Sequence, residues 1–353
     1  MRNKSRFMQR LAGFVLAVAA LAAAAVPAAA QPFGAWLTLA GNPTHGYVQI
    51  PHSAALNPTG ALTIEAWVAI RDAAGCSSII GKDYLEAYWI GICGTTLRAY
   101  LKGGSSAKNG GTVPVDKWTH IAVTFDGATQ RHYINGELIQ SFPLAGPLTT
   151  SSDPVRIGSD VSWQFTPDGS IDEVRIWNVA RTQAQIRSTI NVRINAAEPG
   201  LVSVWGLNGN ANDAVGGRNG ATGGSGVGFL TFPVALNCGS NTATALCLDD
   251  RFLVTAEWRT SPASSGPGRT VSCASDDSGL FWFFAPENWE VMVKVVNGCG
   301  LNNRYWVFSA ATTNVFYRLE VLDVQAGAQK IYFNYPGPPA PAVTDTSAFA
   351  TCP

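Results

Sequence analysis

From about residue 31 onward the chain consists of short strand-like runs separated by turn residues, and this pattern constrains the fold more than any other feature. The run 62–70 alternates apolar and polar side chains as a half-buried strand does. Asn135 and Gly136 separate two further runs, and both tolerate the positive φ that a two-residue type I′ hairpin requires. One short helix is expected over residues 182–188, with Thr182 as its N-cap. Because no long amphipathic helix is visible, the pattern predicts an all-β sandwich.

Residues 1–30 have the three parts of an export signal. A basic segment precedes a continuous apolar run from Leu11 to Val26, and a small-residue cleavage site, Ala28-Ala29-Ala30, follows. The run is shorter than the ~20 residues that span a bilayer. We therefore expect a mature chain that starts at Gln31, has no membrane span and is secreted to the periplasm or the cell exterior. A retained anchor is the alternative.

The charge balance argues against one class of partner. The chain has 24 basic and 24 acidic residues, and loss of the basic leader residues Arg2, Lys4, Arg6 and Arg10 leaves a net charge of about −4. A nucleic-acid binder should carry a basic patch, so no nucleic-acid partner is expected.

Seven cysteines follow the leader, in a compartment where disulfides persist. An odd number leaves at least one cysteine free or joined to another chain. Cys76 and Cys93 are the only two before residue 238, so they are predicted to form one bridge. Spacing alone leaves open how the others pair: Cys238, Cys247, Cys273, Cys299 and Cys352.

A second block of strand-like runs follows a glycine-rich stretch, and the boundary is placed between residues 233 and 234. The runs 290–296 and 317–324 alternate as strands do, and the block has the size of an immunoglobulin-like β-sandwich. The run 280–284, Leu-Phe-Trp-Phe-Phe, is apolar at every position. We expect it to contact the first domain, with ligand binding as the alternative.

Five segments of residues 31–233 carry a family resemblance through their order and spacing: "LTIEAWV", "KWTHIAVTFDG", "HYINGELI", "VRIGS" and "GSIDEVRIWNVARTQAQI". Together they resemble the laminin G-like jelly-roll family of the concanavalin A-like lectin and glucanase superfamily. The resemblance implies a jelly-roll sandwich and the recognition of a glycan or an extracellular protein, as in cell adhesion.

The second block, residues 234–353, resembles a recurrent C-terminal β-domain of bacterial exported proteins that has no established function. The segments "DDSGLFWFF", "VKVVNGCGLN" and "DTSAFATCP" carry this resemblance. In that domain the cysteines that match Cys299 and Cys352 occur together. The resemblance therefore implies a Cys299–Cys352 bridge and a Cys238–Cys247 bridge, which leaves Cys273 over.

A carboxylate near the start of the strand "SIDEVRIW" raises a separate question. With a period of two, Asp172 lies on the same face as the core-like residues Val174 and Ile176. A buried carboxylate needs a partner. Either backbone N–H groups of a neighbouring loop or a hard cation such as Ca²⁺ would satisfy it.

The resemblance favours calcium as the partner of Asp172. In related jelly rolls, including laminarinase-like hydrolases, an aspartate at the matching strand start and a backbone carbonyl of the first-strand turn hold a structural calcium ion. This implies a site made of Asp172, Gly41 and the side chain of Asn42. Family members often carry a second aspartate where Gly46 stands, and its absence lowers the charge of the site.

The superfamily includes glycosidases, which need two carboxylates flanking the scissile bond. In the hydrolytic relatives these acids alternate on one strand as E-x-D-x-x-E, and this sequence has no such string. Asp172 and Glu173 are adjacent, so they are expected to point to opposite faces of the strand. His120 lies in a core-like strand and is interpreted as structural. The chain is therefore not expected to be an enzyme.

Aromatic residues in loops are the candidate ligand contacts, because a flat apolar ring suits recognition. Trp163 precedes the Asp172 strand, and Tyr88 lies in "KDYLEAYWIG"; core packing is the alternative for both. The predicted function is non-catalytic recognition of carbohydrate or an extracellular protein through a calcium-stabilised jelly roll. A glycan-active hydrolase and a purely structural envelope component are the alternatives.

Overall fold

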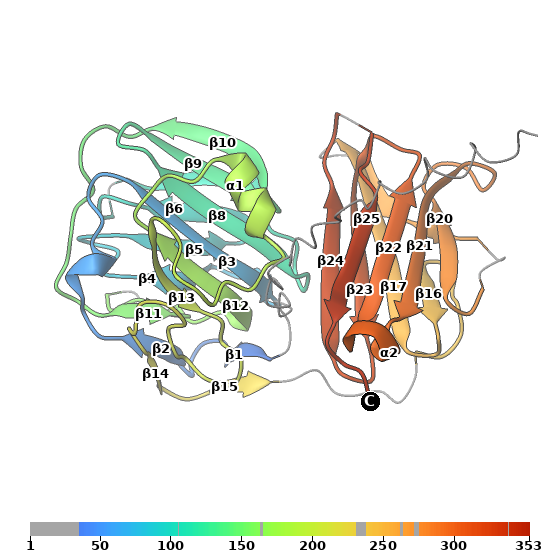
Figure 1. The fold of residues 1–353 in the computed structure, drawn as a ribbon. Coiled ribbons are helices and arrows are strands. Elements are labelled where there is room, and N and C mark those ends of the chain that lie inside the picture. The colour runs from blue at the N-terminus through green and yellow to red at the C-terminus, as the bar shows by residue number, and fades with distance from the viewer. Residues whose placement is uncertain are drawn as a thin grey trace, which may run out of the picture.

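The computed structural model describes residues 35–104, 106–162, 165–230, 238–261, 264–271, 275–337 and 339–353. Figure 1 shows two β-sandwiches side by side, the first coloured blue to yellow and the second orange to red. The predicted all-β fold class is confirmed, because nearly every element is a strand. The predicted leader and the predicted boundary between residues 233 and 234 lie outside the described residues.

The larger sheet of the first domain has the strand order β10-β9-β8-β3-β12-β1-β15, and β13 pairs with β12. All its pairings are antiparallel. Its strands are β1 (Trp36–Ala40), β3 (Leu62–Ile70), β8 (Thr119–Phe125), β9 (Thr129–Ile134), β10 (Glu137–Pro143), β12 (Asp168–Trp177), β13 (Leu201–Trp205) and β15 (Val227–Leu230).

The smaller sheet has the order β14-β2-β11-β4-β5-β6-β7. Its strands are β2 (Tyr47–Ile50), β4 (Cys76–Gly81), β5 (Trp89–Cys93), β6 (Thr96–Tyr100), β7 (Lys108–Thr112), β11 (Val155–Ile157) and β14 (Ala221–Gly223). A 3₁₀ turn, η1 (Ala54–Leu56), follows β2. The alternating residues Ile64, Ala66 and Val68 of the larger sheet enter one buried cluster with Ile90 and Ile92 of the smaller sheet. The core of the first domain therefore lies between its two sheets, as in a jelly-roll sandwich.

The second domain also has two sheets, ordered β16-β17-β23-β24, with β18 on β17, and β19-β20-β21-β22-β25. Its own buried cluster is built from strands of both sheets, and shares no residue with that of the first domain. The strands are β16 (Ala245–Leu248), β17 (Phe252–Ser261), β18 (Ser264–Pro267), β19 (Arg269–Thr270), β20 (Ser278–Trp282), β21 (Trp289–Asn297), β22 (Tyr305–Ala311), β23 (Phe316–Asp323), β24 (Ala328–Asn334) and β25 (Val343–Phe349).

The second domain is thus a β-sandwich, but its strand order is not that of an immunoglobulin domain. An immunoglobulin constant domain divides its strands as ABED and CFG, so the chain changes sheets after every one or two strands. Here β19 to β22 follow one another in a single sheet as a meander. The chain then enters the other sheet for β23 and β24 and returns for β25.

The predicted local signals around residues 129–189 are confirmed. β9 and β10 are joined through Asn135 and Gly136, which both have positive φ, 50° and 73°. Helix α1 (Gln183–Thr189) begins after Thr182, whose side chain accepts the N–H of Gln185 in a capping box. The other α-helix in the described residues is the short α2 (Cys299–Asn302), and no described helix is long and apolar enough to cross a membrane.

A bulge in β12 changes the face on which Asp172 lies. Asp172 pairs with Trp67 and Arg175 with Glu65, so Glu173 and Val174 together oppose Ala66. Glu173 takes a left-handed conformation, with φ of 49°. The alternation therefore changes phase, and the prediction that Asp172 shares the core-facing row of Val174 is wrong. Ile171 occupies that row, whereas Asp172 lies beside Trp67 on the outer face.

Three disulfides join the described cysteines in the predicted pairs: Cys76–Cys93, Cys238–Cys247 and Cys299–Cys352. The first links directly opposed residues of β4 and β5. Cys273, the predicted leftover, lies outside the described residues.

The two domains contact each other through the outer faces of two sheets, and in Figure 1 β24 lies on the side of the second domain that is turned toward the first. Trp67 stacks on Phe333 of β24, with ring centroids 6.2 Å apart, and Arg187 of α1 lies 3.5 Å over the ring of Tyr335. Two ion pairs cross the same interface: Lys117–Glu257 and Glu137–Arg259.

The interdomain contact is not made by residues 280–284, contrary to expectation. Phe281 and Phe283 are buried in the core of the second domain itself. Phe284 is half-exposed and packs edge-on against Trp258 of the same domain. The run is apolar at every position because one of its faces fills this core while Phe284 covers a neighbouring tryptophan.

Candidate functional site

The residues of the predicted calcium site do not come together. Ala40, at the end of β1, pairs with Asp168, and the N–H of Gly41 donates to the carbonyl of Pro167. Gly41 is therefore five positions along β12 from Asp172, about 16 Å at ~3.3 Å per residue. Asn42 is exposed. Gly41 instead lies against Asp168, whose carboxylate forms an ion pair of 2.6 Å with Arg71.

Asp172 is fully buried, and its hydrogen bond is local. Its Oδ1 accepts the backbone N–H of Glu173 at 2.9 Å, while Oδ2 has no hydrogen-bond partner among the described residues. Burial, followed by the charge of Glu173, raises the pKa of Asp172 well above its usual range. Asp172 therefore takes neither predicted partner. A backbone N–H does satisfy one of its oxygens, but it comes from the bulge and not from a neighbouring loop.

The two predicted aromatic contacts have different outcomes. Tyr88 is 3% exposed and belongs to the sandwich core, where it cannot present its ring to a ligand. Trp163 lies outside the described residues. Its neighbour Ser162 is described, and its hydroxyl donates to Asp83 at 2.7 Å. The described residues up to Ser162 therefore meet the loop that follows β4.

Three carboxylates gather where these loops meet, and we call Asp83, Glu86 and Asp153 the rim cluster. Their ligand atoms all lie within 4.8 Å of one another, and the three residues range from buried (Asp83) to exposed (Glu86). The fold explains the assembly, because β11 runs antiparallel beside β4 and Arg156 pairs with Gly81. The start of β11, just after Asp153, thus lies at the end of β4, just before Asp83.

Hydrogen bonds hold the rim cluster in place. Asp83 has a φ of 68°, and its Oδ1 accepts the N–H of Leu85 at 3.0 Å in addition to the Ser162 hydroxyl. The Oδ2 of Asp153 accepts the hydroxyl of Ser151 at 2.7 Å. Since both carboxylates keep further lone pairs, they can still accept from a ligand or bind a cation.

A buried lysine lies beneath the rim cluster. The Nζ of Lys82 donates to the backbone carbonyl of Asp153 and lies 3.1 Å from Nδ1 of His52. Burial lowers the pKa of Lys82 to about 8, although the charge of Asp153 acts in the opposite direction. One ammonium group therefore faces three carboxylates, and the local charge at this rim remains negative.

The rim cluster has the chemistry of a hard-cation site, since Ca²⁺ takes carboxylate, carbonyl and water oxygens. Carboxyl groups about 5 Å apart also meet one requirement of a retaining glycosidase. Sequence reasoning missed the rim cluster because it tested only acids that alternate along one strand. Asp153 and Asp83 meet only through the pairing of β11 with β4. The sequence signal was the acid-containing loop "KDYLE" directly after a strand.

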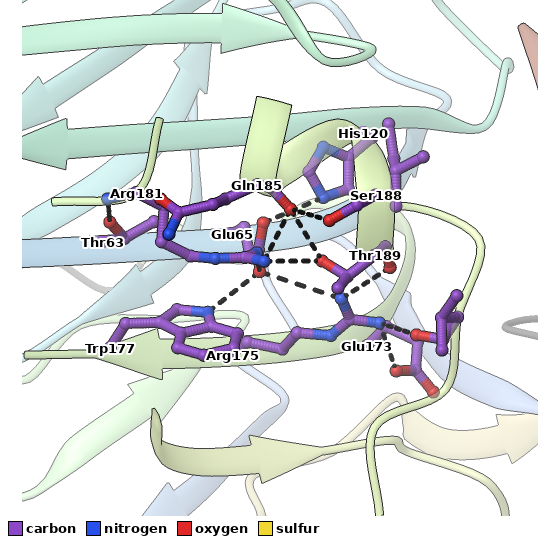
Figure 2. A network of polar contacts seen from close by, with 12 residues as sticks. Thr63, Glu65, His120, Glu173, Arg175, Trp177, Arg181, Gln185, Ser188 and Thr189 are labelled. Carbon is purple, nitrogen blue, oxygen red and sulfur yellow. Dashed lines mark hydrogen bonds and ion pairs between the residues drawn. The ribbon is translucent and has the colours of Figure 1, made fainter. Parts of the chain in front are cut away.

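A second set of charges lies buried on the outer face of the larger sheet, as Figure 2 shows. Oε1 of Glu65 accepts the indole N–H of Trp177 at 2.9 Å and a guanidinium N–H of Arg181 at 2.7 Å. Arg175 lies 3.8 Å from the same oxygen and donates to Glu173 at 2.9 Å. All these side chains are at most 5% exposed, so they fasten β3, β12 and the start of α1 together and leave no opening for a ligand.

His120 belongs to this buried set, in agreement with its structural interpretation. Its Nε2 lies 3.6 Å from Oε2 of Glu65, and its ring packs edge-on against Trp67 at 5.4 Å. Burial lowers the pKa of His120 to about 4 despite the opposing charge of Glu65. His120 is therefore neutral near pH 7.

Comparison with known proteins identifies the first domain. A laminin G family model, described as the concanavalin A-like lectin/glucanases superfamily, matches residues 41–187. Mouse pappalysin-1 is 32% identical over 83 residues, 22% of this chain. The chain spans only 5% of the length of that protein.

Three solved structures have a similar chain path. One is a candidate carbohydrate binding protein from Bacteroides ovatus, with a TM-score of 0.47 and 23% identity over 57% of this chain and 62% of that chain. The second is the heptameric SAP-like pentraxin of Limulus polyphemus, with a TM-score of 0.37 and 14% identity over 44% of this chain and 81% of that chain. The third is the CBM40 of Ruminococcus gnavus IT-sialidase bound to α2,3 sialyllactose, with a TM-score of 0.35 and 13% identity over 43% of this chain and 97% of that chain.

Proposed function

Because residues 41–187 form a laminin G-like domain of the concanavalin A-like lectin/glucanase superfamily, we propose that this chain is an exported, non-catalytic carbohydrate-binding protein. We place its glycan site at the rim cluster of the first domain. The observation that carries the proposal is the convergence of Asp83, Glu86 and Asp153 on one rim of the lectin-like sandwich.

The donor set fits a calcium ion. Ca²⁺ takes six to eight oxygen ligands and accepts carboxylates in flexible geometry. Asp83, Glu86 and Asp153 would hold the ion. Three carboxylates do not fill such a shell, so a bound ion would keep positions for other oxygens, including sugar hydroxyls. The half-buried ring of Tyr84, 5.4 Å from that of Tyr100, offers an apolar surface next to Asp83.

Export is part of the proposal, and the three disulfides support it. Disulfides persist in secreted and periplasmic proteins and are rare in the cytosol. Fractionation of the producing cells tests it: the chain should be found outside the cytoplasm and should begin at Gln31. A chain recovered in the cytoplasm with reduced cysteines would contradict export.

The binding experiment is a glycan-array screen of residues 31–353, with calcium and again with a chelator. The variants D83N and D153N each remove one charge and keep an acceptor oxygen, so the loop hydrogen bonds can survive. The matched control is D72N, because Asp72 is exposed and lies outside the rim cluster. We expect specific glycan binding that chelation removes and that D83N and D153N weaken by at least about tenfold, as expected for a lost charge-assisted contact.

Each other outcome changes the proposal in a defined way. Binding that resists both the chelator and the variants would keep the carbohydrate role but reject the rim cluster and its ion. Release of reducing sugar from the glycans that bind, lost in D83N and D153N, would replace the binding role by a hydrolase. The absence of any glycan ligand would contradict the proposal and leave an extracellular protein partner or a structural role.

A further inference from the structure

A cavity of about 560 Å³ lies between the two domains, away from the rim cluster. The first domain contributes Lys117 to its wall, and the second contributes Trp258, Arg259, Phe316 and Arg318. Cavities of this size are typical of small-ligand sites, which join an apolar wall to a few converging polar groups. This cavity has both, since aromatic rings and basic groups line it together.

The charges on the wall favour an anion. Lys117, Arg259 and Arg318 line the cavity, against the single acidic residue Glu257. The carboxylates that pair with the two arginines, Glu137 and Glu320, are not part of this wall. The full sequence is balanced at 24 basic and 24 acidic residues, so this positive wall is a local feature. Lys117 pairs with Glu257 on the wall itself, so the excess of positive charge comes from the two arginines. A cleft whose lining carries an excess of one sign of charge attracts ligands of the opposite sign.

Arg318 is the central group of this site. It is 7% exposed and, together with Lys117 and Glu257, also lines a second cavity of about 460 Å³. Its terminal amino group lies 2.7 Å from Glu320, but its Nε–H has no hydrogen-bond partner among the described residues. An unpaired buried donor is costly, and a bound water, ion or ligand is one way to satisfy it.

The part of the cavity wall that the second domain contributes includes packed aromatic side chains. The indole of Trp258 lies against Gly266, where an added Cβ would come within 3.2 Å of the ring. The guanidinium of Arg259 lies 4.3 Å over the ring of Phe316, which fixes that basic group beside the aromatic wall. A sugar ring can lie against such a surface while an anionic substituent reaches the basic groups.

We propose that this interdomain cavity binds a sugar chain carrying an anionic group, a carboxylate or a sulfate ester, through the guanidinium groups of Arg318 and Arg259 with Lys117 nearby. Guanidinium N–H groups match the oxygens of both anions. The site would hold the two domains around one ligand. It is separate from the rim cluster and needs no metal ion, so it goes beyond the proposed function.

Isothermal titration of the full mature chain tests the proposal. The probes are trigalacturonic acid, its fully methyl-esterified neutral form, and a sulfated neutral trisaccharide. We expect binding of at least one anionic probe, no binding of the ester, and weakening as salt increases. Whichever anionic probe binds identifies the source of the charge. Equal binding of the acid and its ester, or no binding of either anion, would overturn the proposal.

Variants locate the site. R318M keeps the aliphatic stem and removes the guanidinium, and it should weaken anion binding at least about tenfold. K117M changes a half-exposed residue of the other domain, and should weaken it about two- to fivefold without a risk to folding. The control is K294M, on the far sheet of the second domain. If R318M and K117M bind as K294M does, the cavity is not the site.

The two proposals fail independently. D83N and addition of a chelator should leave binding of the anionic probe unchanged, because neither touches the interdomain cavity. Loss of that binding in D83N, with R318M unaffected, would assign the anion to the rim cluster and reject the cavity.

Discussion

Glu65 is the group on which the buried charges of the first domain converge, and its neutralisation tests how they are held. In the variant E65Q the side chain keeps its shape and one acceptor oxygen, but Arg181 and Arg175 lose the carboxylate within 3.8 Å of them. Both guanidinium groups remain buried. The variant therefore measures the charge alone, with little change in packing.

The expected loss of stability follows from the contacts. Oε1 of Glu65 accepts from Arg181 at 2.7 Å and from Trp177 at 2.9 Å. A hydrogen bond to a charged group contributes about 1.5–3 kcal/mol and a neutral one about 0.5–1.5 kcal/mol. Neutralising the shared acceptor weakens two such bonds and the longer pair with Arg175, which amounts to about 2–3 kcal/mol. Removal of the whole side chain in E65A should cost about 3–5 kcal/mol, the usual loss when one partner of a buried pair is deleted.

Urea unfolding of residues 31–353 at pH 7 measures the effect, with tryptophan fluorescence as the signal. For a domain of this size the E65Q loss corresponds to a fall in Tm of about 4–12 °C. The control D72N changes an exposed carboxylate of the same domain and should shift stability by less than about 0.5 kcal/mol. In a double-mutant cycle with R181M, the coupling energy should exceed about 1 kcal/mol. An E65Q protein as stable as D72N, or a coupling near zero, would refute this account of the network.

Three further predictions concern other parts of the chain. The pKa of His120 is lowered from 6.5 to about 4 in the folded state, so neutral His120 favours the folded state above pH 6.5. This contribution is lost as the pH falls from 6.5 through 4, because only the unfolded state binds the proton there. Urea midpoints measured across that range should therefore fall, and they should fall less steeply in H120Q. Loss of the Cys299–Cys352 bridge, which closes a separation of 53 residues, should destabilise the second domain by about 4 kcal/mol in the chain-entropy picture, as calorimetry of the double serine variant would show. Gly136→Ala places a Cβ on a residue with a φ of 73°, 2.7 Å from the hydroxyl of Tyr335. Thermal unfolding should show a loss of stability of about 1–3 kcal/mol. In the control Gly60→Ala the added Cβ meets nothing within 4 Å, so its stability should be nearly unchanged.

Local signals in the sequence were sufficient for much of the fold. Asn135-Gly136 and the Thr182 cap act over a few residues, so composition and spacing specify them directly. The bridge between Cys76 and Cys93 could be predicted because only two cysteines precede residue 238.

The features that could not be predicted depend on tertiary context. The alternation of side chains along β12 changes phase at Glu173, and a glutamate in the sequence does not indicate a left-handed backbone conformation. The rim cluster forms only when β11 pairs with β4, so its acids are distant in sequence. The family resemblance implied one site for Gly41 and Asp172, but the register of β1 on β12, which cannot be read from the sequence, sets them apart.

The position of Trp67 has a consequence for the time course of folding. Its indole donates to the carbonyl of Ile190 and lies against Phe333, with no exposed surface. The first domain can complete all its strands once residue 230 has been made, yet the face of this tryptophan that meets Phe333 stays uncovered until the chain has been extended to that residue. During synthesis the N-terminal sandwich therefore passes through an interval with an exposed aromatic patch, in which a binding chaperone or premature self-association would compete with the arrival of its own second domain.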